Sequence, residues 1–202
     1  MKSPMKFRLL LACMLFLGLI GPAAITYPAA PEGGKEAALQ SLSHALKPFR
    51  VDRVEDLAIS APCQIYRVEL TNLAAGDLVS AAHPGYACGW ECLVLKGPKA
   101  GGLCFLWADR VTGKVTNCLA VADEVAGKWQ AAISVAEQVP VVKQRDYAIR
   151  FVDVGLPQFR AVWLHGRSED IFIPLYDDRG GRLKALQTYT EKELIRVWQP
   201  MA

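Results

Sequence analysis

Residues 103–121, LCFLWADRVTGKVTNCLAV, consist of two apolar runs joined by a short polar segment. The runs cover residues 103–108 and 114–121, and DRVTG at residues 109–113 lies between them. Apolar runs separated by a short segment that contains Asp and Gly predict a β-hairpin. We therefore expect antiparallel strands at the centre of this fold.

The segment before the hairpin is expected to hold one helix and one strand. Leucines at helical spacing predict an amphipathic helix over residues 35–47, which Pro48 would end. Residues 64–70 alternate between apolar and polar side chains, as a half-buried strand does. Residues 72–102 are rich in Gly, Ala and Pro, so we expect an irregular insertion with one short strand over residues 92–96.

The segment after the hairpin repeats this order of a helix followed by strands. A second helix is predicted over residues 124–138, and a capping-box pattern over residues 190–193 opens a short C-terminal helix. Pro174 cannot donate to a β-ladder, so its strand is expected at a sheet edge or at a bulge. The strands between the two helices are predicted over residues 147–154, 159–165, 171–176 and 182–186.

These elements predict the α+β class: antiparallel β-meanders packed against two longer helices and a short C-terminal helix, with an irregular insertion that contains cysteines. Residues 35–202 would form one exported domain. Residues 107–115 and 175–183 share the order strand, Asp, Gly, basic residue, aliphatic residue. This similarity fits two related helix-plus-meander halves, residues 35–122 and 123–202, and it equally fits two unrelated hairpins with the same turn chemistry.

The N-terminus has the pattern of an export signal. Basic residues precede an uncharged apolar core over residues 9–20, and small residues follow it. This length matches the apolar core of a signal peptide, roughly 7–15 residues, and is below the roughly 20 residues that span a bilayer. Residues 1–30 are therefore predicted to be a signal peptide or, if uncleaved, a membrane anchor through residues 9–25, with a spacer over residues 31–34. In both cases the domain would be secreted, periplasmic or at the cell surface.

The charge pattern argues against nucleic-acid binding. Lys2, Lys6 and Arg8 account for the formal net charge of +3, so the remainder of the chain is neutral. Acidic and basic residues are interspersed there, without the basic stripe that binds phosphates. We expect no nucleic acid among the partners.

Five cysteines after the signal are candidates for disulfide bonds, because exported thiols are usually oxidised. The two at the ends of the predicted hairpin, Cys104 and Cys118, would face each other across it. Cys88 and Cys92 would then close a small loop, and Cys63 would remain free or pair between chains. The sequence does not fix these pairings, and the other arrangements of the five residues stay open.

A thiol-dependent redox or metal-binding activity at Cys88 and Cys92 is the enzymatic alternative. The three residues between these cysteines and the lack of a following helix differ from a thioredoxin-type centre. His83 could join the cysteines around zinc, although the spacings are loose. Leu93 directly after Cys92 excludes a c-type haem motif. The sequence contains no G-x-S-x-G elbow or phosphate loop, so we predict no catalytic residue, no metal ligand and no cofactor.

The hairpin residues Asp109, Thr112, Gly113, Lys114 and Val115 resemble the D-x-x-T-G-x-V hairpin of PepSY domains. PepSY domains are exported modules that occur in protease propeptides and as inhibitors. The resemblance covers about ten residues and implies a protease-regulating module as a further alternative.

The leading functional hypothesis is a non-enzymatic exported protein that binds a protein or a small ligand at the cell envelope. Tyr86 and Trp90 lie in the Gly-rich cysteine segment, where an aromatic side chain on a braced loop could contact a partner. These two residues are the predicted binding residues.

Overall fold

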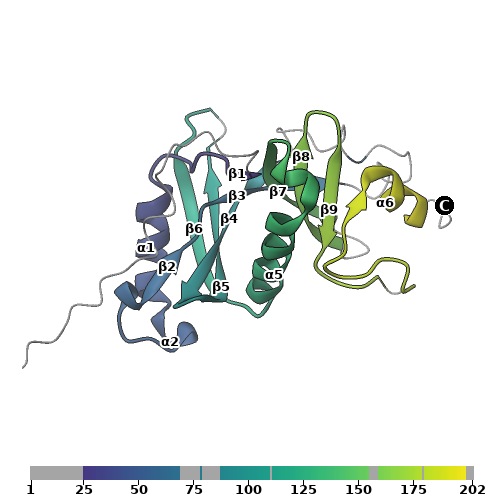
Figure 1. The fold of residues 1–202 in the computed structure, drawn as a ribbon. Coiled ribbons are helices and arrows are strands. Elements are labelled where there is room, and N and C mark those ends of the chain that lie inside the picture. The colour runs from purple at the N-terminus through teal and green to yellow at the C-terminus, as the bar shows by residue number, and fades with distance from the viewer. Residues whose placement is uncertain are drawn as a thin grey trace, which may run out of the picture.

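One mixed β-sheet forms the centre of the molecule in the computed structural model (Figure 1). The structure describes residues 25–68, 78, 87–109, 111–154, 159–178 and 180–198. Within these residues ten strands join in the order β10-β9-β8-β7-β3-β4-β5-β6, with β1 beside β7 and β2 beside β4. The strands are β1 (Ile25–Thr26), β2 (Leu57–Ile59), β3 (Cys63–Val68), β4 (Ala87–Lys96), β5 (Lys99–Ala108), β6 (Val115–Ala122), β7 (Tyr147–Val154), β8 (Phe159–Gly166), β9 (Asp170–Pro174) and β10 (Tyr189–Thr190).

The two halves of the sheet meet at a parallel pair of strands. β3 lies beside β7, with Ile65 opposite Phe151. From β3 the order continues through β4, β5 and β6 as antiparallel neighbours, and from β7 it continues through β8 and β9 in the other direction. The carboxyl ends of β3 and β7 therefore lie side by side where the two halves of the chain diverge.

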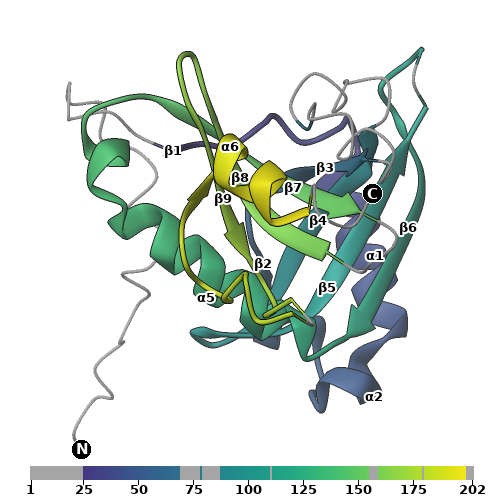
Figure 2. The same cartoon turned by 90° about the vertical axis from the view of Figure 1, so that its right-hand side faces the viewer.

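Helices cover both faces of this sheet (Figures 1 and 2). α1 (Gly34–His44) packs on β5 and β6, whereas α5 (Val125–Gln138) packs mainly on β5, β8, β4 and β9. Figure 1 shows α1 and α5 on opposite sides of β4, β5 and β6. α6 (Glu191–Trp198) packs beside β9 and β10, and the shorter helical segments are α2 (Leu46–Phe49), η1 (Val54–Asp56) and η3 (Pro140–Lys143).

Successive side chains of β4 lie alternately in the two cores, one on each face of the sheet. Leu93 lies in the core beneath α5, where the ring of Trp129 stacks on that of Phe151 with centroids 3.6 Å apart. Its neighbours Cys92 and Val94 lie in the core beneath α1. Successive side chains of a strand point to opposite faces, so a strand covered on both faces is apolar at most positions.

Both longer helices and the C-terminal helix are confirmed, with one difference at the first. α1 ends at His44, and Pro48 lies inside α2 instead of ending a helix. Pro48 is tolerated there because the first turn of a helix has no internal partner for its amide. At α6 the predicted capping box forms: the Thr190 amide donates to Glu193 Oε2 (2.7 Å), and the Glu193 amide donates to Thr190 Oγ1 (3.4 Å).

The predicted irregular insertion is wrong for its second part. β4 begins at Ala87 and runs for ten residues, and β5 begins at Lys99 after a turn in which Gly97 has a φ of 60°. The error has a physical cause, because a strand buried on both faces lacks the polar alternation that identifies strands in a sequence. The first part of the insertion, residues 72–86, lies outside the described residues except for residue 78.

The predicted strand over residues 182–186 is also wrong. The amides of Leu183 and Ala185 donate to the side chains of Asp178 (2.6 Å) and Asp177 (2.7 Å). Leu186 then adopts a left-handed φ of 62°. Aspartate side chains that capture backbone amides offer an alternative to a β-ladder, and β10 pairs with β9 instead.

The architecture is a mixture of α and β with a large, mostly antiparallel sheet and four α-helices among the described residues, which is consistent with the α+β class. Of the helices in this part of the chain, none is long and apolar enough to cross a membrane. The predicted export signal lies outside the described residues up to residue 24.

Candidate functional site

Glu91 is a buried carboxyl group near the centre of the sheet. It lies on β4 between Cys63 of β3 and Phe105 of β5, and only 1% of the residue is exposed. Neither of its carboxyl oxygens has a hydrogen-bond partner among the described residues. A carboxyl group buried in this way is costly when charged, so it indicates a functional role or a shift in protonation.

Three further charged residues stand in a row across β3, β7 and β8. Arg67 is in register with Asp153, and Asp153 with Arg160, so the three side chains share one face of the sheet. Arg160 Nη2 lies 3.6 Å from Glu91 Oε2, and Arg160 Nε lies 3.6 Å from Asp153 Oδ2. Both contacts are ion pairs, but they are longer than a hydrogen bond. The Arg160 guanidinium thus has N–H donors that no described residue uses.

A cleft of about 190 Å³ opens beside this row of charges. Arg67, Asp153 and Arg160 line one part of it, and Phe105 and Trp107 of β5 line another. The rings of Phe105 and Trp107 stack with centroids 6.0 Å apart and an interplanar angle of 25°. The cleft lies toward the carboxyl ends of β3 and β7. Its volume is below the roughly 300–1,000 Å³ of drug-sized ligand sites, so it suits a small molecule or one side chain.

Burial raises the pKa of Glu91 to about 7, from an ordinary value of 4.5. The positive charge of Arg160 lowers this pKa, while the negative charges of Asp153 and Asp123 raise it further. The indole N–H of Trp129, on α5, also lowers it slightly without forming a hydrogen bond of good geometry. Glu91 therefore changes its charge within the neutral pH range, unlike an exposed glutamate.

Arg160 also contacts a tryptophan of α5. The guanidinium carbon of Arg160 lies 5.6 Å from the ring centroid of Trp129, which is 1% exposed. Trp129 thus covers the space between Arg160 and the core, because an indole face attracts a guanidinium and excludes water. This contact holds Arg160 beside Glu91, and the Arg160 side chain, which is 23% exposed, also lines the cleft.

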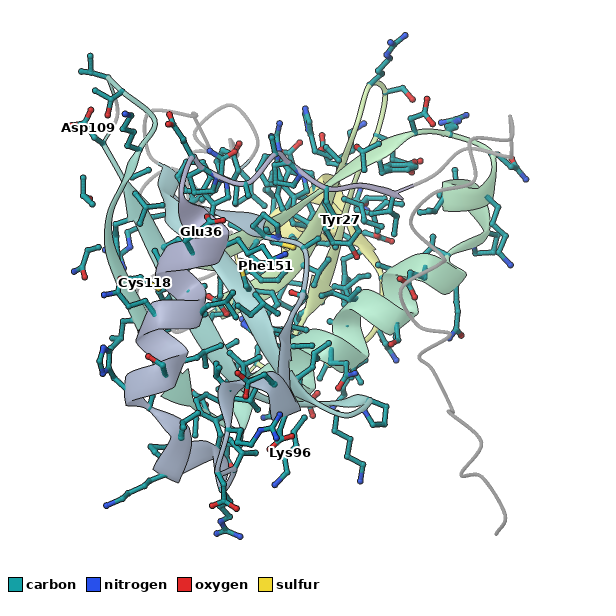
Figure 3. The ribbon with its side chains drawn as sticks, turned by 90° about the vertical axis from the view of Figure 1, so that its left-hand side faces the viewer. Tyr27, Glu36, Lys96, Asp109, Cys118 and Phe151 are labelled. Atoms are coloured by element: carbon teal, nitrogen blue, oxygen red, sulfur yellow. The ribbon has the colours of Figure 1, made fainter. Side chains whose placement is uncertain are left out.

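Three of the predicted disulfide cysteines lie on the opposite face, beneath α1. Cys92 is in register with Cys104 on β5, and the Sγ atoms of Cys104 and Cys118 are 3.3 Å apart. Figure 3 shows Cys118 beside α1. All three, and Cys63 on the α5 side, are free thiols in the structure, so the predicted disulfide bonds are not formed there. Oxidation of these thiols stays a prediction.

Strand geometry opposes the pairing of Cys88 with Cys92. Both residues lie in the continuous strand β4. Residues four apart in a strand are separated by about 13 Å, far beyond the Cα distance of about 7 Å that a disulfide allows. The Cys88 side chain and Tyr86 lie outside the described part of the chain. Burial raises the pKa of the Cys92 thiol to about 12, which disfavours a reactive thiolate.

Trp90, the other predicted binding residue, contributes to the cleft. It lies on β4 next to Glu91, is half-buried, and its indole nitrogen has no hydrogen-bond partner among the described residues. The sequence predicts a loop at Trp90, whereas the structure places this residue in a central strand.

His165 forms a hydrogen-bonded pair with an aspartate but has no nucleophile beside it among the described residues. His165 Nδ1 lies 2.8 Å from Asp170 Oδ1, which also accepts a hydrogen bond from Trp163 Nε1 at 2.7 Å. No described serine, threonine or cysteine makes a hydrogen bond to His165 in the structure. His83 lies outside the described residues. Where the chain is described, no group of three or more His, Cys, Asp and Glu residues is arranged to hold a metal ion.

The hairpin motif that resembles PepSY domains is accounted for by turn chemistry. Asp109 Oδ1 accepts hydrogen bonds from the amides of Val111 (3.0 Å) and Thr112 (2.7 Å) and from the Thr112 hydroxyl (3.0 Å). Gly113 has a left-handed φ of 70°. Asp109 lies at the end of the molecule opposite Lys96 (Figure 3). These contacts explain the Asp, Thr and Gly as parts of one turn.

A comparison of the chain with protein-family models, with curated proteins and with solved structures finds no match. The site is therefore defined by its geometry alone.

Sequence reasoning missed Glu91, Arg160 and Asp153. One signal was present: Glu91 is the only charged residue between residues 87 and 95, in what is otherwise an uncharged segment. Asp153 and Arg160 looked like the polar positions of ordinary half-buried strands. Only the pairing of β7 with β3 and β8 brings them to Glu91.

Proposed function

We propose that this protein is an exported, non-enzymatic binding protein of the cell envelope whose ligand occupies the cleft beside Glu91. One observation carries the proposal: a buried carboxyl group without hydrogen bonds lies behind an arginine whose N–H donors face a cleft with a stacked aromatic pair. Such convergence of polar groups on an apolar hollow is typical of ligand sites. The ligand is a small molecule or a side chain of a protein partner.

Binding is favoured over catalysis because the described residues that line the cleft include no activated nucleophile. The described cysteines nearest to it are buried, and burial raises the pKa of the Cys63 and Cys92 thiols. Catalytic thiols need a lowered pKa. Arg67, Asp153 and Arg160 recognise charge, and Phe105 and Trp107 offer flat apolar faces.

A ligand-observed NMR screen of small fragments tests this function. We expect fragments to bind the wild-type protein and to lose binding when Arg67→Gln and Trp107→Ala are combined. Both positions are accessible enough for the double variant to fold, since Arg67 is exposed and Trp107 is 36% exposed. Val111→Ala, at a hairpin position that is 93% exposed, is the matched control. Binding that survives in the double variant would contradict a ligand site in this cleft.

Export is tested separately by mass spectrometry of the protein from its native cell. We expect a mature N-terminus within residues 21–31, or an uncleaved chain in the membrane fraction. An intact chain that starts at Met1 and is recovered in the soluble interior of the cell would contradict export and leave the cleft proposal standing.

A further inference from the structure

The charges that line the cleft favour an anion. The charged residues that line the cleft are two arginines, Arg67 and Arg160, and one aspartate, Asp153. Among the described residues, Arg67 has no ion-pair partner, and the two ion pairs of Arg160, with Glu91 and Asp153, are both long. A guanidinium binds a carboxylate best through two parallel hydrogen bonds. Arg160 has the donors for this interaction, and Arg67 adds a second positive charge.

The aromatic pair indicates what the anion is attached to. Phe105 and Trp107 stack at 6.0 Å on β5, and both line the same hollow as Arg160. Offset packing of a planar ring against such a pair is favourable. The volume of about 190 Å³ has room for one ring with a short acid chain and not for a larger molecule.

On the basis of the proposed function, we propose that the cleft binds a small aromatic carboxylate, whose acid group takes the place of ionised Glu91 as the counter-charge of Arg160. The aromatic ring packs on Phe105 and Trp107. Two sources share this chemistry: a free aromatic acid, and the C-terminal carboxylate of a polypeptide that ends in an aromatic residue.

Binding is coupled to a proton on Glu91. When Glu91 is protonated, Arg160 keeps only Asp153 as a counter-charge and can accept the ligand. When Glu91 is ionised, the ligand adds a further negative charge beside a buried one. Among the described residues, the charged and titratable groups around Glu91 are Arg160 from β8, Asp153 from β7, Asp123 before α5 and Cys63 from β3, while its neighbour Cys92 lies on the opposite face. Both thiols are neutral near pH 7, so the carboxylates and Arg160 decide the state of Glu91.

Calorimetric titration with phenylacetate tests this ligand class. We expect phenylacetate to bind at pH 6, and its neutral analogue phenylacetamide, its cationic analogue phenethylamine and acetate to bind at least tenfold more weakly. The apparent affinity for phenylacetate should fall about tenfold from pH 6 to pH 8, because the protonated fraction of a group with a pKa of about 7 falls by that factor. A tripeptide that ends in phenylalanine, with a free or an amidated C-terminus, distinguishes the two sources.

Variants separate this inference from a general effect of pH. Glu91→Gln should bind phenylacetate with nearly equal affinity at pH 6 and pH 8. Arg67→Gln should weaken binding about tenfold at both pH values, and Arg53→Gln, remote and exposed, should leave it unchanged. Circular dichroism confirms folding of each variant.

Each possible result tests a different part of the inference. If phenylacetamide or phenethylamine binds the cleft as tightly as phenylacetate, the ligand class is wrong and the binding site itself stands. If the pH dependence persists in Glu91→Gln, the coupling to Glu91 is wrong. If neither these probes nor any fragment binds, both the inference and the proposed function fail.

Discussion

Glu91 and Cys92 are neighbours on β4, yet they lie in opposite environments. Glu91 points toward the α5 side, beside Arg160 and the cleft, and Cys92 lies beneath α1 in register with Cys104. Burial raises the pKa of both side chains. A thiol is already neutral at pH 7, so a raised pKa does not change its charge there. A carboxyl group is normally charged at pH 7, and a pKa of about 7 leaves it charged in only half of the molecules. The same burial therefore makes one face responsive to pH and leaves the other inert.

The test with the largest expected effect truncates, on each face of the sheet, a buried side chain of the helix that packs there. Trp129→Ala and Leu42→Ala truncate buried residues of α5 and α1 that are 1% and 0% exposed. We expect losses of about 4 and about 3 kcal/mol in the free energy of unfolding. Trp129→Ala should also admit water to Glu91 and reduce the pH dependence of stability. Leu42→Ala should preserve that dependence, as measured by urea unfolding at pH 5 and pH 8. Equal pH profiles in the two variants would contradict the role assigned to Trp129.

The next test concerns the cost of the Glu91 charge. The pKa of Glu91 in the folded protein, about 7, is above its ordinary value of 4.5, so the folded state binds the proton more tightly. The stability that comes from the bound proton on Glu91 should therefore be fully present below about pH 4.5 and should be lost as the pH rises to 7. The loss amounts to about 3 kcal/mol.

Glu91→Gln should remove this loss. We expect the variant to be more stable than wild type by about 3 kcal/mol at pH 8 and equal to it at pH 4.5, as measured by chemical denaturation. Glu32→Gln, which removes an exposed partner of Lys114, is the control and should leave the pH profile unchanged. A variant that is less stable than wild type at pH 8 would show that the ion pair with Arg160 outweighs the cost of burial.

On the thiol face, the test is oxidation. The Sγ atoms of Cys104 and Cys118 are 3.3 Å apart, so oxidised glutathione can accept their two electrons and two protons and leave a disulfide. We expect the bond to raise the free energy of unfolding by about 2 kcal/mol, because it closes a loop of moderate length. Mass spectrometry after alkylation identifies the pair, and Cys63→Ser, on the other face, should not affect it. A Cys92–Cys104 bond instead would contradict this pairing.

The smallest expected effect lies outside both faces. Thr190→Ala removes the capping hydroxyl of α6. This hydroxyl accepts a hydrogen bond from the Glu193 amide and donates one to the Glu193 carboxylate. A loss of about 1 kcal/mol in the free energy of unfolding is expected from thermal or urea unfolding. Lys192→Ala, exposed on the same helix, should change stability little. The loss of stability in Thr190→Ala provides the scale against which the larger effects on the two faces of the sheet can be judged.

Local signals in the sequence were sufficient for much of the fold. The leucine spacing of α1, the apolar face of α5, the Asp109 turn and the Thr190 capping box all depend on contacts between residues close in the chain. Those elements were predicted with small errors at their ends. The Gly- and Ala-rich start of β4 was not, because its strand character comes from neighbours on both faces.

The sequence by itself determined the helices and the hairpin, since each follows from local periodicity and turn chemistry. Only the tertiary structure decided the site. The parallel pairing of β3 with β7 joins residues more than eighty positions apart, and it sets Arg160 and Asp153 beside Glu91. Ionisation of a carboxyl group depends on its surroundings in space, and those surroundings come from strands whose order no local pattern specifies.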